Sequence, residues 1–136
     1  MQLTREEAIA NHRKMWNWIA DETERWEDCA TKSDYFKNLF DLPIPQNECY
    51  CCEYAHDIAL HSVCSGCPLL WGSHFATCIF DGSSKNKRGL YVQWERACKE
   101  KDWQKSARLA REIANLPERK GMTNNGQAIH FNDPVA

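Results

Sequence analysis

The sequence predicts a mainly α-helical protein, a small helical domain with a cysteine-rich loop segment inserted between its helices. Apolar residues recur every three to four positions near both ends of the chain, and capping residues stand where these runs begin. The middle differs, because six of the eight cysteines lie within thirty residues there. A chain of 136 residues, 43% of them hydrophobic, can form a single domain (1–136) and excludes two large lobes.

The N-terminal part, residues 1–45, is expected to hold helices. Thr4 and Glu7 form the S/T-x-x-E capping box, so a first helix should begin there and run to about Trp26. Its apolar face is expected to lie in the core and consists of Ile9, Met15, Trp16, Ile19, Ala20 and Trp26. A second short helix or turn is indicated by Tyr35, Phe36, Leu39 and Phe40.

Residues 88–118 are expected to form a helical hairpin. The first apolar stripe consists of Leu90, Tyr91, Trp94, Ala97 and Cys98. Continuing its phase would bury Lys101 and Asp102, so the stripe must stop, and Asp102 is a suitable N-cap for a second helix. The second stripe consists of Trp103, Ala107, Ala110, Ile113 and Ala114. Pro117 follows its end, and the tail, 120–136, is expected to be flexible.

Two cysteine pairs in the segment 46–80 predict a zinc site. Cys49 and Cys52, followed by Cys64 and Cys67, give the spacing C-x2-C-x11-C-x2-C. Four thiolates suit tetrahedral zinc, and the x2 spacing lets both sulfurs of a pair face one metal. We therefore expect a four-cysteine, zinc-knuckle-like loop insertion with a structural Zn²⁺, in which loops carry the ligands.

Other cysteines and histidines leave the ligand set open. Cys51 adjoins Cys52, and Cys78 or a histidine could replace one of the four ligands. The candidate histidines are His56, His61 and His74. Disulfide-linked or reactive thiols are the less favoured explanations of the cluster. Cys29 and Cys98 lie outside it, near helical faces, and are interpreted as packing residues.

The formal charge of −2 is unevenly distributed. Residues 1–48 carry 6 basic and 10 acidic side chains, 49–80 carry 2 acidic ones, and 81–136 carry 11 basic and 7 acidic ones. The basic excess allows an anion-binding surface, for which the candidates are Lys85, Lys87, Arg88, Arg108 and Arg111, joined by Arg119 and Lys120 for a nucleic acid. A thiolate-bound zinc in an acidic segment would repel phosphate, so the metal segment is interpreted as a structural clip.

The sequence favours neither a membrane protein nor an enzyme. The N-terminus is charged where a secretory signal would be apolar, and no stretch approaches the ~18 apolar residues of a membrane helix, so a cytoplasmic location is expected. The chain lacks H-E-x-x-H, the phosphate-binding G-x-x-x-x-G-K-[ST] and the H-x-E of zinc deaminases. No catalytic residue is therefore assigned.

Motifs spread over most of the chain carry a resemblance. They are Cys49-Tyr-Cys-Cys-Glu-Tyr-Ala, Cys64-Ser-Gly-Cys-Pro-Leu, Trp71, Gly89-Leu-Tyr-x2-Trp and the run from Asp102 to Arg119. In these motifs the chain resembles small cysteine-bearing proteins encoded by phages and prophages of Gram-positive bacteria. The resemblance implies a protein of the host cytosol. It also favours Cys52 and Cys67 as ligands, with Cys49 and Cys64 as their partners.

The leading hypothesis is a zinc-stabilised, phage-type interaction protein that binds and modulates a host macromolecule, with inhibition of host defence as one such role. A host protein is the expected partner, because small phage proteins often act by binding host machinery. The supply of six Trp, four Tyr and five Phe offers side chains that can anchor a partner. The alternatives are a nucleic-acid-binding zinc protein and a binder that sequesters a small nucleotide signal.

Overall fold

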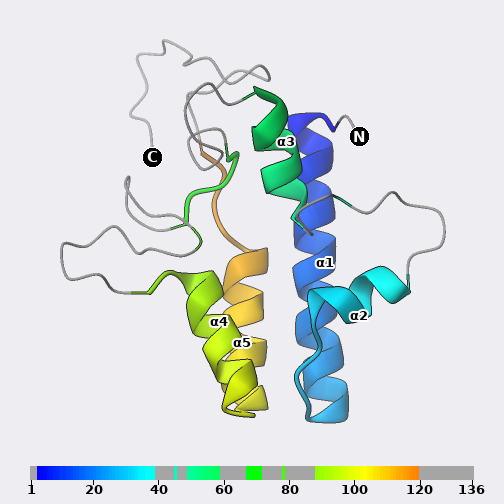
Figure 1. Cartoon of the computed structure of the whole chain (residues 1–136), viewed down its shortest axis with the longest axis vertical. Coiled ribbons are helices and arrows are strands. Elements are labelled where there is room, and N and C mark those ends of the chain that lie inside the picture. Colours follow the sequence, from blue (N-terminus) through cyan, green and yellow to red (C-terminus); the bar gives the residue numbers. More distant parts are fainter. Residues whose placement is uncertain are drawn as a thin grey trace.

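A computed structural model shows a mainly helical protein, as predicted (Figure 1). It describes residues 3–38, 45, 49–58, 67–71, 78 and 88–119. The helices are α1 (Arg5–Trp26), α2 (Lys32–Lys37), α3 (Tyr50–Ile58), α4 (Leu90–Lys99) and α5 (Trp103–Ala114). In the described part, none of these helices is long and apolar enough to cross a membrane.

Helix α1 begins and ends where the sequence predicts. The Thr4 hydroxyl accepts the Glu7 N–H at 3.1 Å, and the Glu7 carboxylate accepts the Thr4 N–H at 2.9 Å, which completes the capping box. The predicted face is buried except at Trp26, which is 67% exposed and so contradicts the expectation. Its indole N–H donates to Glu22 one turn earlier at 2.7 Å, so the ring lies along its own helix and not toward the core.

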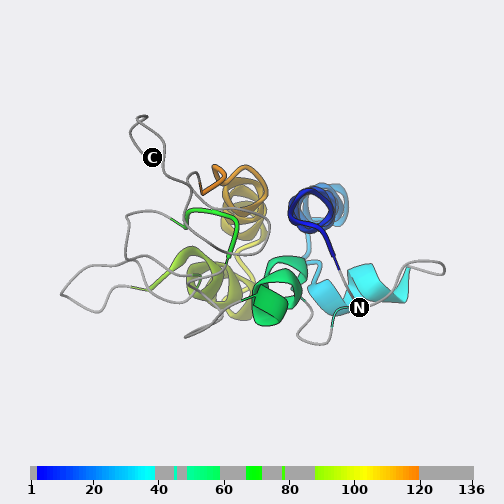
Figure 2. The same ribbon diagram turned by 90° about the horizontal axis from the view of Figure 1, so that it is seen from above.

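The predicted hairpin is confirmed. Asp102 caps α5 by accepting the Lys105 N–H at 3.1 Å, and α5 packs against both α4 and α1. Trp16 of α1 meets Trp94 of α4 edge to face, with 4.9 Å between ring centroids. Seen from above in Figure 2, α1, α3, α4 and α5 are arranged around one interior.

Cys29 and Cys98 form a disulfide, so their interpretation as packing residues alone is wrong. Their Cα atoms lie 5.6 Å apart, in the usual range for a disulfide. The bond joins the connection between α1 and α2 to the end of α4. Both residues are also partly buried against the core. A separation of 69 residues leaves no local pattern that could have predicted the pairing.

The expectation that loops carry the clustered cysteines is wrong for residues 50–58, which form α3. Tyr50, Cys51, Tyr54 and Ala55 are buried, and α3 packs against α1. The last three residues lie one, four and five positions after Tyr50, a spacing that places all four on one face of the helix. The breakers in this segment, such as Gly66, all lie after α3. The predicted tail, 120–136, lies outside the described residues.

Candidate functional site: a cluster of thiols

Cys49 stands directly before α3, where the helix presents free backbone N–H groups. Its carbonyl accepts the Glu53 N–H at 2.9 Å, which begins the helix. Its sulfur accepts the Cys52 N–H at 3.4 Å, as a capping side chain does. A negative charge is favourable at such a helix start, so this position suits a thiolate.

Cys67 is held on a short segment, 67–71, that pairs with the chain after α5. Leu69 and Glu118 form an isolated antiparallel bridge. The Leu70 N–H donates to the Pro117 carbonyl at 2.9 Å, and the Arg119 N–H donates to the Pro68 carbonyl at 2.7 Å. Residues distant in sequence therefore fix the position of Cys67.

The two segments bring free thiols together in two hydrogen-bonded pairs. The Cys52 thiol contacts the Cys49 sulfur, and the Cys51 thiol contacts the Cys67 sulfur. Cys51 is fully buried, and Cys52 also interacts electrostatically with Cys67 and Cys78. We call Cys49, Cys51, Cys52, Cys67 and Cys78 the thiol cluster.

Within each pair, one sulfur is the acceptor and the other the donor. The hydrogen bond from Cys52 lowers the pKa of Cys49 to about 6 against the opposing effect of burial. The hydrogen bond from Cys51 likewise lowers the pKa of Cys67. Donation of the proton, together with burial, raises the pKa of Cys51 and of Cys52. The acceptor sulfurs are those on which negative charge is best stabilised.

Two residues outside the cysteine motifs stabilise negative charge on these sulfurs. Lys32, the first residue of α2, also lowers the pKa of Cys49 through its charge. Its ammonium lies 4.3 Å from the ring centroid of Tyr91 and 5.7 Å from that of Trp16. The Trp71 side chain makes a hydrogen bond to the Cys67 sulfur. Sequence reasoning missed Lys32, because α2 lies outside the segment searched for ligands.

Three of the four predicted zinc ligands, Cys49, Cys52 and Cys67, lie in the thiol cluster. Cys51 and the alternative ligand Cys78 join them, whereas Cys64, His61 and His74 and the side chain of His56 lie outside what is described. Among the described residues, no group of three or more Cys, His, Asp or Glu side chains is placed so that it could hold a metal ion.

The chemistry of these donors fits zinc. Thiolate sulfur is a preferred zinc ligand, and N–H groups directed at such sulfurs are typical of the surroundings of metal-bound thiolates. Here the Cys52 N–H reaches Cys49, and the Leu69 N–H and the Trp71 side chain reach Cys67. The charge of Lys32 would offset part of the negative charge that several thiolates bring to one ion.

His12, which was not a predicted ligand, is a buried core residue. Its Nε2 lies 2.9 Å from the Ile113 carbonyl, which can only accept, so Nε2 carries the proton. Its Nδ1 has no hydrogen-bond partner. Burial lowers the pKa of His12 to about 4, so the ring is neutral at pH 7 and joins α1 to α5.

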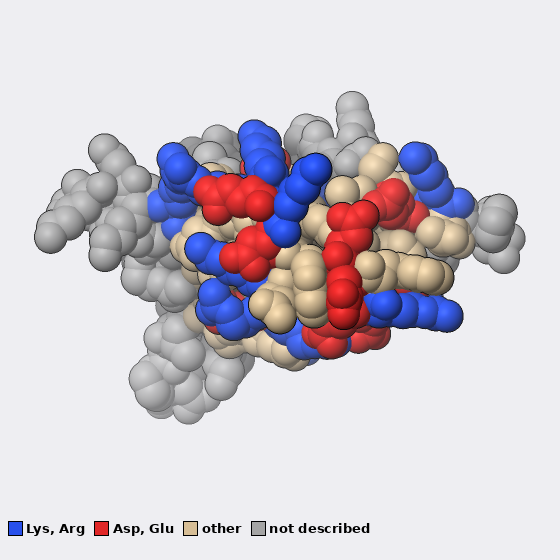
Figure 3. All heavy atoms as spheres, turned by 90° about the horizontal axis from the view of Figure 1, so that it is seen from below, with Lys and Arg blue, Asp and Glu red and all other residues tan. Residues whose placement is uncertain are grey.

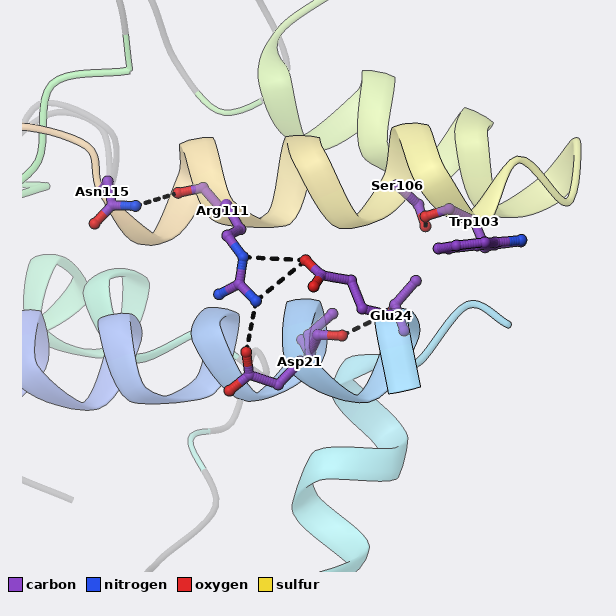
Figure 4. A network of polar contacts seen from close by, with 8 residues as sticks. Asp21, Glu24, Trp103, Ser106, Arg111 and Asn115 are labelled. Carbon is purple, nitrogen blue, oxygen red and sulfur yellow. Dashed lines mark hydrogen bonds and ion pairs between the residues drawn. The ribbon is translucent and has the colours of Figure 1, made fainter. Parts of the chain in front are cut away.

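Two of the predicted anion-binding residues are paired with carboxylates. Arg111 lies 2.6 Å from Asp21 and 3.1 Å from Glu24, and thereby ties α5 to α1 (Figure 4). Arg108 lies 3.7 Å from Glu112. Both arginines line a groove of about 690 Å³ that also includes Trp103. The remaining candidates are Arg88 and Arg119, which are described, and Lys85, Lys87 and Lys120, which lie outside the described residues.

Comparison of the chain with models of known protein families, with curated proteins and with solved structures finds no match. The function is therefore inferred from the thiol cluster and from the exposed surface of the helices.

Proposed function

We propose that this chain is a zinc-stabilised interaction protein of the kind encoded by phages, which binds and modulates a host protein. We infer no catalytic centre of its own. The thiol cluster is the observation that carries the proposal, because it offers several sulfur donors to a metal ion. The resemblance of its cysteine and tryptophan motifs to small phage and prophage proteins adds the expected setting, the host cytosol, where a disulfide such as that of Cys29 and Cys98 is unusual.

Zinc would be held by Cys49, Cys52 and Cys67, with Cys64 as the fourth ligand and Cys78 or Cys51 as its replacement. Cys49 and Cys67 are the sulfurs on which negative charge is stabilised best. An ion shared by these cysteines would join α3 to the segment 67–71. This is the structural clip of the zinc-knuckle-like insertion, although its first pair of ligands lies at a helix start.

The metal would stabilise a binding surface and take no part in a reaction. Structural zinc contributes about 10 to 16 kcal/mol of apparent binding energy, comparable to the ~5 to 15 kcal/mol stability of a domain. The helices then remain free to bind a partner through their outer faces. Trp26, exposed at the end of α1, is the kind of aromatic side chain that anchors protein interfaces.

Native mass spectrometry of the protein purified from bacteria without added metal or chelator tests the metal. We expect one zinc ion per chain, lost in the variant Cys67→Ser and retained in the control Cys98→Ser. A zinc-free protein with the mass of additional disulfides would contradict the proposal.

Capture from host lysate, with the tagged zinc-loaded protein, tests the interaction. We expect one host protein to be enriched relative to a chelator-treated sample. If no protein is enriched over the background, binding of a host protein is refuted, whatever the zinc content.

A further inference from the structure

A second groove lies between the end of α1 and α2. We call it the α1–α2 groove. It measures about 380 Å³. Its lining residues are Trp18, Glu22, Trp26, Asp28, Cys29, Ala30, Asp34 and Asn38. No lysine or arginine is among them.

Two tryptophans give the groove its aromatic surface. Among the described residues, Trp26 is the only large hydrophobic side chain that is strongly exposed. Its hydrogen bond to Glu22 holds the indole in place, and the Arg25 guanidinium lies 5.3 Å from its ring centroid. Trp18 is supported by edge contact with Tyr35, at 5.4 Å between centroids. Fixed indole rings attract cations, as the position of Arg25 illustrates.

Three carboxylates of the groove lack a cationic partner among the described residues. Glu22 accepts from the Trp26 indole, Asp28 from the Cys29 N–H at 3.0 Å, and Asp34 from Thr31 at the start of α2. None of these three forms a salt bridge there. Their hydrogen bonds fix the carboxylates and leave their negative charge uncompensated.

The potential around the groove is negative for two more reasons. The backbone carbonyls at the end of α1 add the negative pole of a helix dipole, and Asp34 offsets the positive pole at the start of α2. Figure 3 shows a strip of carboxylates on this face, on the side of α1 and α2, with Lys and Arg side chains both beside it and over α4 and α5. A cation therefore meets attraction from carboxylates, aromatic rings and the helix end together.

We propose that the α1–α2 groove binds a basic segment of a protein partner, with an arginine side chain that stacks on the Trp26 ring and donates to the carboxylates of Glu22 and Asp28. A guanidinium suits these walls, because it stacks on aromatic rings and donates to carboxylates in the same pose. This inference rests on the proposed interaction function and adds the chemistry of the partner.

A hexa-arginine peptide and its hexa-citrulline analogue test the inference, because citrulline keeps the shape of arginine and lacks its charge. The zinc-loaded full chain labelled with ¹⁵N is titrated with each peptide, and the signals of its six indole N–H groups are followed. We expect hexa-arginine to shift the Trp26 and Trp18 signals and to leave Trp103 unchanged. Equal shifts with hexa-citrulline, or shifts at Trp103 alone, would overturn the inference.

The double variant Glu22→Gln/Asp28→Asn removes two charges and keeps the oxygen acceptors. We expect it to weaken hexa-arginine binding by about tenfold. The control Glu95→Gln/Glu112→Gln removes the same charge from α4 and α5 and should change affinity less than about twofold. Trp26→Ala, whose side chain is exposed, should weaken binding and preserve the fold. Equal weakening by both double variants would show general charge attraction and refute the groove.

The lysate capture separates this inference from the proposed function. If the Glu22→Gln/Asp28→Asn variant still captures the partner at the wild-type level, the groove is refuted and the interaction function stands. If neither protein captures a partner, the interaction function is refuted, and the peptide titration alone decides about the groove. Binding of free spermidine as tight as that of hexa-arginine would refute the assignment to a protein segment.

Discussion

The frame made by α1, α4 and α5 is held by packing of aromatic and aliphatic side chains, whereas α3 and the segment 67–71 add sulfur contacts and a backbone bridge to such packing. In the frame, neighbouring helices bury complementary faces around Trp16, Trp94 and Ile113. In the thiol region, Tyr50 and Leu69 join the same core, and the surroundings of the Cys49 and Cys67 sulfurs favour negative charge on them. Charge on these sulfurs needs an ion or protons to balance it, a requirement that the aromatic and aliphatic packing of the frame does not have.

Metal removal should have the largest effect of the changes considered, and it should affect the two regions differently. We expect a chelator to expose α3 and the segment 67–71 to rapid hydrogen exchange, because about 10 to 16 kcal/mol of apparent zinc binding is lost. The amides of α1 and α5 should stay protected. The Cys67→Ser variant serves as the control and should show no further change with chelator. If the exchange of α3 is the same with and without chelator, zinc does not hold this region.

Loss of the disulfide should destabilise the frame. A cross-link between residues 69 positions apart stabilises by about 4 kcal/mol when it acts on the unfolded chain. We expect Cys29→Ser/Cys98→Ser to lower the free energy of unfolding by about this amount in urea titrations followed by circular dichroism. A phosphine reductant should destabilise the wild type similarly and leave the variant unchanged. An unchanged midpoint in the variant would argue against a disulfide in solution.

Acid should weaken the frame through His12. Its pKa is lowered from 6.5 to about 4 in the folded state, so the unfolded chain binds more protons between these values. Stability is therefore retained above pH 6.5 and falls as the pH is lowered toward 4. Between pH 7 and pH 5 we expect the wild type to lose about 2 kcal/mol more than His12→Gln. Equal losses measured by urea unfolding would assign the acid sensitivity to other groups.

The smallest effect concerns the link between the two regions, the charge of Lys32 beside Cys49. We expect Lys32→Gln to weaken zinc binding by about tenfold in chelator competition, as loss of a residue that supports metal ligands commonly does. Lys37→Gln, on the exposed end of the same helix, is the matched control and should leave the affinity unchanged. An equal loss in both variants would indicate a general charge effect.

Local sequence signals were enough to predict the helices of the frame. The Thr4 and Glu7 capping box placed the start of α1, and Asp102 placed the break between α4 and α5. Trp26 was the exception, because helical periodicity alone cannot show that a neighbouring element fails to cover the end of a helix.

The thiol cluster was predictable in composition and not in arrangement. The x2 spacing identified Cys49, Cys52 and Cys67, all of which the fold brings into one cluster. The contact of Cys51 with Cys67 depends on which face of α3 is buried. The position of Lys32 depends on the path of a different helix. These are tertiary relations, and no motif in one segment encodes them.

The pairing of Leu69 with Glu118 also bears on how the chain folds as the ribosome makes it. Synthesis proceeds from the N-terminus, so α1, α3 and Cys67 emerge well before the residues that complete the bridge. Helix α1 likewise waits for α5, its main packing partner. The nascent chain must therefore carry its free thiols and the face of α1 that packs on α5 uncovered until almost all of the helical part has been translated.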